Sequence, residues 1–259
     1  MKSSRLRSAI KAMLPNALCR ALGIKNLGLS RPRWGNMRRL SPFSRLFGLD
    51  RGGKPIDRVY IEGFLQRNEG EIQGEVLEIG APTYTQMFGG EDVSTVDVLH
   101  ATPGNPRSTI VGDLTTGEGI PISKYDCMIL TQTFLCIFDV RNAIRNSWKA
   151  LKPGGVLLAT VPGVSQISRY DMDRWGDYWR FTDLSARRLF EDVFGEGNVD
   201  IATHGNILVA CAFLHGLATH ELRRDELDHV DPDYQVLITV KAVKNVPMMP
   251  PPSQVGNRA

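Results

Sequence analysis

Short apolar stretches without regular polar alternation recur along this chain, separated by stretches with helical spacing. An apolar run that does not alternate is typical of a strand buried on both faces of a parallel sheet. Such runs occupy residues 75–79, 93–98, 109–111, 126–130, 156–161, 199–202 and 236–243. Helical spacing, or the place for a crossover helix, is found at residues 56–65, 85–90, 142–151, 184–194 and 208–222. The order predicts an α/β fold with helices on both faces of the sheet.

Acidic residues come at or near the ends of the first three strand-like runs. Glu78 precedes the Gly80 turn, Asp97 lies 19 residues later, and Asp113 follows the third run. In open α/β sheets ligands bind at the carboxyl ends of the strands, and an acid about 20 residues after the first strand accepts hydrogen bonds from ribose hydroxyls. We therefore expect Asp97 to hold a ribose. Asp113 is expected to accept from an adenine amino group while the amide of Leu114 meets the ring.

The loop after the first strand has Pro82 and Tyr84 where a dinucleotide-binding loop has glycines. Such glycines let the backbone approach a pyrophosphate closely. Pro82 lacks an amide donor and Tyr84 adds bulk, so the loop favours a nucleoside without phosphates. The hydroxyls of Thr83, Tyr84 and Thr85 are candidate replacements for the missing glycine amides.

These motifs together resemble the class I S-adenosylmethionine-dependent methyltransferases. The resemblance covers roughly residues 40–243 and includes Glu78, Gly80, Asp97, Asp113, Thr131-Gln132-Thr133 and Leu151-Lys152-Pro153-Gly154-Gly155. Residues 174–182 (RWGDYWRFT) resemble a signature of bacterial methyltransferase-like proteins associated with glycan or glycolipid assembly. The resemblance implies a Rossmann-like seven-stranded sheet with an antiparallel last strand, and S-adenosyl-L-methionine as the cofactor. It places the cofactor against Glu78, Gly80, Pro82, Tyr84, Asp97, Val98, Asp113, Leu114 and Gln132.

The chemistry of methyl transfer is expected in the loop after residues 156–161. Asp171 and Asp173 are the first candidates for a base, and His204 and His100 also follow strand-like runs. Carboxylates beside aromatic rings suit a sugar or other glycan acceptor, because rings stack on the apolar face of a sugar. The candidate substrate contacts are Tyr170, Arg174, Trp175, Tyr178 and Arg180. The alternative is that the aromatic residues fill core gaps and that Asp177 pairs with Arg180 structurally.

Charge divides the chain unequally. Residues 1–54 contain 13 Lys or Arg and one acid, Asp50, which leaves 18 basic and 27 acidic residues for the rest. We expect a basic, helical N-terminal extension at 1–54, a methyltransferase-like domain at 55–246 and a disordered Pro-rich tail at 247–259. Apolar residues between positions 6 and 18 suit an anionic membrane surface, although Pro15 interrupts that helix and favours packing on the domain.

Other classes of protein are less compatible with the sequence. Lys11, Pro15 and Arg20 interrupt the apolar runs that a secretory signal or membrane span would need, so a cytoplasmic location is expected, with peripheral contact at the inner membrane surface as the alternative. The four cysteines lack metal-ligand spacing, and we expect reduced thiols and no metal site. A non-catalytic module recruited through the basic extension is the rival hypothesis. Nicotinamide chemistry is disfavoured by the loop, and nucleic-acid binding by the acidic domain.

Overall fold

The computed structural model describes residues 35–245 of the chain. It divides into two compact units, Met1–Ser41 and Pro42–Ala259. The described part of the first unit holds one 3-10 turn, η1 (Gly35–Met37). The expected membrane-surface helix near the N-terminus and the expected disordered tail at 247–259 lie outside the described residues.

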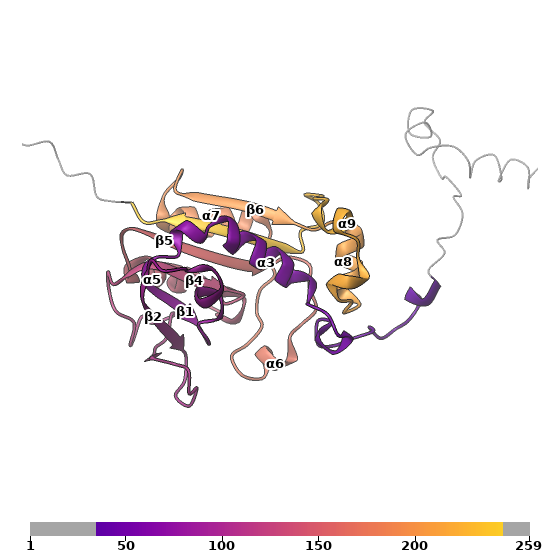
Figure 1. The fold of residues 1–259 in the computed structure, drawn as a ribbon, viewed down its shortest axis with the longest axis horizontal. Coiled ribbons are helices and arrows are strands. Elements are labelled where there is room, and N and C mark those ends of the chain that lie inside the picture. Colours follow the sequence, from indigo (N-terminus) through magenta and orange to yellow (C-terminus); the bar gives the residue numbers. More distant parts are fainter. Residues whose placement is uncertain (1–34, 246–259) are drawn as a thin grey trace, which may run out of the picture. The chain divides into compact units, whose positions relative to one another are not determined.

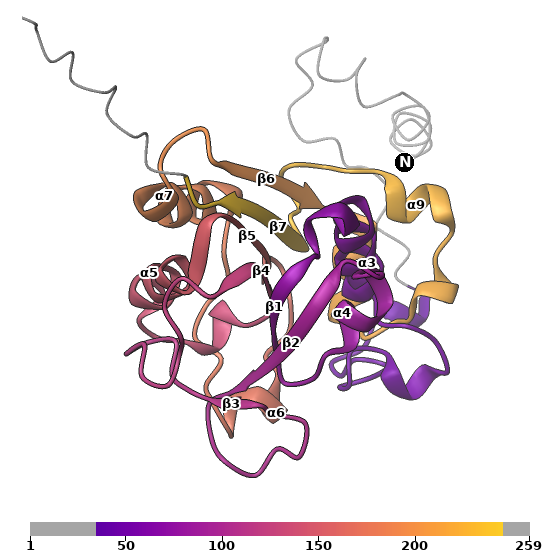
Figure 2. The same cartoon turned by 60° about the vertical axis from the view of Figure 1, so that its left-hand side comes forward.

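The second unit is built on a seven-stranded sheet in the order β3-β2-β1-β4-β5-β7-β6 (Figures 1 and 2). Strands β1 to β5 pair in parallel, whereas β7 runs antiparallel to both β5 and β6. The predicted seven-stranded sheet with an antiparallel last strand is confirmed. The strands are β1 (Gly74–Ile79), β2 (Val93–His100), β3 (Ile110–Val111), β4 (Tyr125–Thr131), β5 (Leu151–Pro162), β6 (Val199–His204) and β7 (Leu237–Val243).

Helices cover both faces of this sheet, as predicted. Figure 2 shows α5 and α7 on one side of the strands and α3 and α4 on the other. Successive strand residues enter opposite cores: Leu77 packs with the α5 and α7 side and Val76 with the α3 side. The helices are α3 (Ile56–Arg67), α4 (Thr83–Phe88), α5 (Val140–Ala150), α6 (Arg169–Met172), α7 (Asp183–Phe194), α8 (Ile207–Leu214) and α9 (Arg224–Asp228). Short 3-10 turns are η2 (Leu49–Arg51), η3 (Glu69–Glu71), η4 (Phe134–Cys136) and η5 (Thr219–Glu221).

The long helix predicted at 208–222 is wrong in its second half. Helix α8 ends at Leu214, and the chain turns at Gly216, whose φ is +68°. A Cβ on Gly216 would lie 2.2 Å from the carbonyl oxygen of Ser44, so only glycine allows this close approach. The apolar residues that continue the helical pattern beyond Leu214 therefore belong to a turn and to η5.

The compact unit begins at Pro42, before the domain boundary expected at residue 55. The backbone amides of Phe43 and Ser44 donate to the carbonyl oxygen of His215, at 2.8 and 3.2 Å. The guanidinium of Arg51 donates to both carboxylate oxygens of Glu221. Residues 42–54 thus pack on the segment that follows α8. Across the described range 35–245, no helix is long and apolar enough to span a membrane.

Candidate functional site

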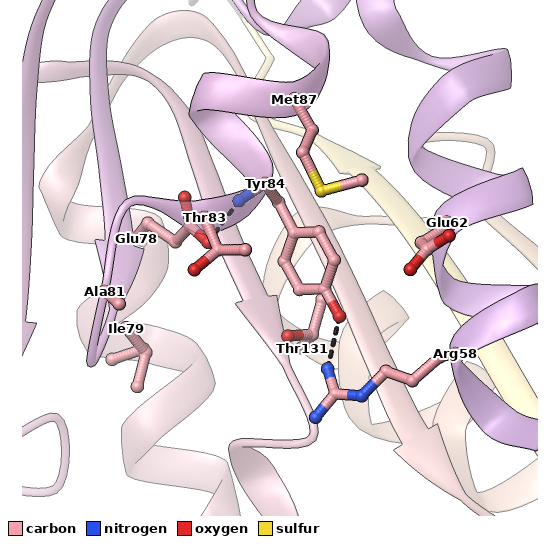
Figure 3. Close-up of a pocket in the computed structure, with 9 residues that line it drawn as sticks. All are labelled: Arg58, Glu62, Glu78, Ile79, Ala81, Thr83, Tyr84, Met87 and Thr131. Carbon is pink, nitrogen blue, oxygen red and sulfur yellow. Dashed lines mark hydrogen bonds between the residues drawn. The ribbon is translucent and has the colours of Figure 1, made fainter. Parts of the chain in front are cut away.

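Two neighbouring cavities lie at the carboxyl ends of the parallel strands. The large cavity, about 660 Å³, is walled by the ends of β1, β2 and β4, the residues after β3, and the segment after β5. The small cavity, about 440 Å³, lies between α3, α4 and the ends of β1 and β4 (Figure 3). Ile79 and Thr131 belong to the walls of both. The two cavities therefore adjoin at the strand ends, where open α/β sheets bind ligands.

Gly80 makes the turn from β1 toward α4 on the wall of the large cavity. Its φ is +76°, and a Cβ there would meet no atom within 4 Å, so the backbone conformation rather than crowding favours glycine. The Gly80 amide donates to the carbonyl of Leu99 at 3.0 Å, and Asn105 Nδ2 donates to the Gly80 carbonyl at 2.8 Å. These bonds fix the turn and keep open space beside it.

Glu78 is buried beneath this turn and binds the start of α4. Its carboxylate accepts from the amides of Tyr84 and Thr85, each at 2.9 Å, and from the Thr85 hydroxyl at 2.7 Å. Burial raises the pKa of the Glu78 carboxyl, while these hydrogen bonds lower it. Glu78 therefore anchors α4 and also forms part of the small cavity wall.

The residues that replace the loop glycines do not fill the large cavity. Pro82 is the residue before α4 and lies outside both cavity walls. Tyr84 points into the small cavity, where its hydroxyl accepts a hydrogen bond from the guanidinium of Arg58 (Figure 3). The bulk of Tyr84 thus leaves the region beside Gly80 open.

The prediction that Asp97 ends the second strand is wrong. Strand β2 continues to His100, and the Asp97 carboxylate accepts from Lys124 Nζ at 2.6 Å, Thr109 Oγ1 at 2.8 Å and the Tyr125 hydroxyl at 3.0 Å. Burial opposes the charge of Asp97, but these donors lower its pKa below the usual range. Neither Asp97 nor the buried Val98 belongs to a cavity wall. Asp97 therefore links β2 by hydrogen bonds to Thr109, which precedes β3, and to Lys124 and Tyr125 at the start of β4.

His100 occupies the strand end at which the acid was expected. It lines the large cavity opposite Gly80, because Ile79 pairs with Leu99 in the sheet. Its Nδ1 lies 2.6 Å from the carbonyl oxygen of Thr102 and 3.3 Å from the Thr102 amide nitrogen, so Thr102 engages this edge of the ring. Within residues 35–245 no hydrogen bond involves Nε2, and this nitrogen is available to a ligand. The edge of Trp175 meets His100 at 5.9 Å between ring centroids.

Asp113, Leu114 and Gln132 all line the large cavity, as expected. The Asp113 carboxylate accepts from the amide of Thr115 at 2.7 Å, which holds the turn after β3. Leu114 is buried, and its carbonyl accepts from Asn146 Nδ2 at 2.8 Å. Gln132 follows β4 with φ at +49°, a left-handed conformation that is costly for a residue with a side chain. The backbone amide of Gln132 donates a hydrogen bond to the carbonyl oxygen of Thr160 at 3.0 Å, and this bond stabilises the left-handed conformation.

The segment after β5 contributes Tyr170, Asp171, Trp175 and Tyr178 to the same cavity. No hydrogen bond among residues 35–245 ends on the carboxylate of Asp171, so this acid is available to a ligand. Asp173 is different: it is exposed, follows α6 and lies outside both walls. Arg174 also lies outside, with its guanidinium 3.8 Å from the ring centre of Tyr170. Asp171 is the better placed of the two predicted acids.

Arg180 was predicted as a substrate contact, but it holds this segment together. Its guanidinium donates to the Asp177 carboxylate, with Nη2 at 3.0 Å, and to the carbonyl of Gln166 at 2.6 Å. The fully buried Asp177 side chain also accepts from the amide of Ser168 at 2.8 Å. Asp177 and Arg180 therefore form a structural ion pair, which was the alternative to substrate binding.

His204 lies outside both cavities, contrary to the expectation of a catalytic position. It stacks on Tyr60 of α3, with 5.2 Å between ring centroids, and its Nε2 is 3.4 Å from Thr239 Oγ1. Burial lowers the pKa of His204 to about 4, so the ring is neutral and packed. The described residues contain no group of three or more side chains able to hold a metal ion.

The strand order and the single antiparallel strand decide the fold. It is the class I methyltransferase fold. The sequence matches no family model and no curated protein.

Similar solved structures include a SAM-dependent methyltransferase from Archaeoglobus fulgidus. It is 12% identical, with a TM-score of 0.48 over 72% of this chain and 94% of that chain. Phospholethanolamine N-methyltransferase 2 from Haemonchus contortus, in complex with phosphomonomethylethanolamine and S-adenosylhomocysteine, is 14% identical, with a TM-score of 0.49 over 82% of this chain and 55% of that chain.

Proposed function

We propose that this protein is an S-adenosyl-L-methionine-dependent methyltransferase that methylates a hydroxyl of a sugar, glycan or glycolipid. One observation supports this proposal above others. A single cavity joins the strand ends at Gly80 and Asp113 to an available carboxylate, Asp171, and to exposed aromatic rings. A transferase needs this arrangement, because cofactor and acceptor must meet in one enclosed space.

The walls of the large cavity suit a nucleoside. The turn at Gly80 leaves open space, Leu114 offers an apolar surface for a base, and Asp113 offers a carboxylate for an amino group. His100 offers the ring nitrogen Nε2 to the ribose hydroxyls, the contact that the sequence had suggested for Asp97. These four residues would hold the nucleoside part of the cofactor.

When bound, the cofactor supplies an electrophilic methyl group on a sulfonium sulfur. Asp171 would accept the hydrogen of the acceptor hydroxyl, orient its oxygen and take up the proton that the hydroxyl loses when the methyl group leaves the sulfonium sulfur for that oxygen. Gln132 lines the same cavity. Most of the remaining work is positioning, since an in-line displacement requires the reacting atoms about 3 Å apart and aligned.

A sugar acceptor is supported by the aromatic side chains around the cavity mouth. Tyr170 is 61% exposed, Tyr178 52% and the neighbouring Phe138 69%. Phe138 stacks on Trp179 and meets the edge of Tyr178. A patch of exposed aromatic rings is typical of a binding surface, and aromatic rings stack well on the apolar faces of sugars. Asp171 adds the carboxylate that sugar hydroxyls favour.

Calorimetry with S-adenosylhomocysteine and turnover with labelled S-adenosylmethionine test the proposal. Asp171→Asn should bind S-adenosylhomocysteine as the intact protein does, while methyl transfer to a panel of sugar nucleotides and glycolipids falls about 10²- to 10⁴-fold. Asp173→Asn is the matched control, because this acid lies outside the cavity, and its turnover should not change. Absence of binding to the intact protein would refute the methyltransferase proposal. Transfer to RNA or small phenols alone would refute the sugar acceptor.

A further inference from the structure

The outward side of helix α8 is apolar along its whole length. Ile207, Cys211 and Leu214 follow one another at helical spacing, and the exposed Leu208 lies on the same side. The opposite side packs into the core with Val209, Ala210, Ala212 and Phe213. A surface helix of a globular protein normally turns polar residues outward, so an outward apolar side is typical of a surface that binds a partner.

Two neighbouring segments extend this apolar side. The ring of Phe47 lies 5.7 Å from that of Phe213 between centroids, so residues 45–49 pack against the end of α8 (Figure 1). Gln166 Nε2 donates to the carbonyl of Arg45 at 3.0 Å, which brings residues 164–167 next to them. We call the exposed apolar residues of these three segments the apolar face: Leu46, Leu49, Ile167, Ile207, Leu208 and Leu214.

The segments of the apolar face leave the sheet at the edge that holds the cavities. Strand β7 is antiparallel to both β5 and β6, so β5 and β6 end at the same edge, and residues 164–167 and α8 follow them. Ile167 leads into the segment whose Tyr170 and Asp171 line the large cavity. A partner on the apolar face would therefore lie close to a wall of that cavity.

The charges beside the apolar face favour an anionic partner. Arg45 and Arg169 adjoin the face, both are exposed, and no ion pair among residues 35–245 includes either. Residues 1–54, which supply Leu46 and Leu49, contain 13 Lys or Arg and one acid, Asp50. Two copies of the chain that met through this face would bring two such basic segments together, and these would repel each other. An anionic lipid surface instead attracts the basic residues and accepts the apolar side chains.

We propose that the apolar face docks on an anionic membrane, with its aliphatic side chains at the boundary of headgroups and acyl chains and with Arg45 and Arg169 on lipid phosphates. This surface belongs to the compact unit and is separate from residues 6–18, whose sequence alone also suits such a membrane. Docking needs no cofactor, so the inference stands or falls separately from the proposed function. If both hold, docking brings the large cavity close to the headgroups of glycolipid acceptors.

Cosedimentation of the intact chain with phosphatidylcholine vesicles that contain phosphatidylserine tests the docking surface. Leu46→Glu and Leu214→Glu should each lower the partition coefficient about 10-fold or more, because each removes an apolar contact with lipid and sets a negative charge against anionic headgroups. Ile122→Glu is the matched control, since all three variants change the net charge equally. Ile122 is 75% exposed, against 57% for Leu46, but it precedes β4 and so lies at the opposite edge of the sheet. Its substitution should change binding less than about twofold.

Arg45→Ala should weaken binding to these vesicles about fivefold and leave binding to pure phosphatidylcholine vesicles unchanged. Three results would overturn the inference. The intact chain does not bind the anionic vesicles; or both Glu variants bind as the intact chain does, which assigns any lipid contact to charge elsewhere; or light scattering shows a dimer that Leu46→Glu dissociates, which assigns the face to a second copy. Circular dichroism checks the fold of each variant, and if Leu214→Glu unfolds, Leu46→Glu on its separate segment decides.

Discussion

At the residue scale, Asp97 and His100 on β2 have different surroundings and different expected roles. Asp97 is surrounded by Lys124, Thr109 and Tyr125, and three hydrogen bonds already end on its carboxylate. His100 lines the large cavity, and no hydrogen bond among residues 35–245 involves its Nε2. Substitution of Asp97 should therefore lower the stability of the fold, and substitution of His100 should lower the affinity for the proposed ligand, S-adenosylhomocysteine.

Asp97→Asn should lower the free energy of unfolding by about 1–3 kcal/mol, because charged hydrogen bonds are lost, and change the Kd for S-adenosylhomocysteine less than about twofold. His100→Ala should leave stability nearly unchanged and weaken this ligand about 3- to 10-fold. Urea unfolding and calorimetry measure the two effects.

Since the folded pKa of Asp97 is lowered, its stabilisation is present above the ordinary carboxyl range and is lost as pH falls through the folded value. The opposite assignment would be supported if Asp97→Asn alone weakened the ligand.

The difference between these two residues shows which parts of the site the sequence could predict. The positions of Gly80, Asp113, Leu114 and Gln132 at the large cavity could be predicted, because turn residues mark the strand ends beside them. No turn residue shows in the sequence where β2 ends. The strand is apolar up to Leu99, as expected for a strand buried on both faces, so its last residue could not be predicted. Sheet register, with Leu99 opposite Ile79, decides that His100 reaches the cavity.

At the element scale, short parallel strands and amphipathic helices were predictable, but segments held by distant contacts were not. The segment around helix α6 is an example. There the buried Asp177 carboxylate accepts hydrogen bonds from Ser168 and Arg180, and no local sequence pattern predicts these contacts. Helix α8 is another, because Gly216 must approach Ser44 from a different part of the chain. Both are tertiary effects that override local propensity.

The Asp177 and Arg180 pair holds the segment that carries Asp171 and Trp175. Asp177→Asn should lower the free energy of unfolding by about 1–3 kcal/mol, raise the KM for the acceptor and leave the Kd of S-adenosylhomocysteine unchanged, because Gly80, Asp113 and Leu114, the proposed nucleoside contacts, lie on other elements. Thermal unfolding, steady-state kinetics and calorimetry measure these effects. Arg187→Ala, which breaks the exposed pair with Glu191 on α7, should change none of them. A large loss of cofactor affinity in Asp177→Asn would contradict a role confined to this segment.

At the scale of the whole molecule, the basic segment at the N-terminus is not structurally uniform. Residues 42–54 belong to the compact unit, whereas Met1–Ser41 form a separate unit. The contacts of the first part are specific: Phe43 and Ser44 bond to His215, and Arg51 forms a fork with Glu221. The basic residues of the segment are therefore divided between the two units, and each group can be tested separately.

Two truncations separate the stabilising part from the rest. A chain that begins at Pro42 should keep its Tm and its affinity for S-adenosylhomocysteine. A chain that begins at Pro55 should lose about 5–10 °C in Tm at pH 7, because several buried contacts and the Arg51 fork are removed. Hydrogen bonding from Arg51 lowers the pKa of Glu221 to about 2. The fork therefore stabilises above the ordinary value of 4.5 and weakens as pH falls toward 2, so the Tm deficit should be smaller at pH 3.

The same truncations test the hypothesis that the basic segment recruits the protein to an anionic membrane. Cosedimentation with vesicles containing phosphatidylserine should fall when residues 1–41 are removed, if that unit makes the contact, and the fall should grow at low salt where charge attraction is strongest. Equal binding by the intact protein and by the chain from Pro42 would assign any membrane contact to the compact unit. Since that chain should retain ligand affinity, recruitment and methyl transfer can be measured separately, and a catalytically inactive but membrane-bound protein would favour the binding-module hypothesis.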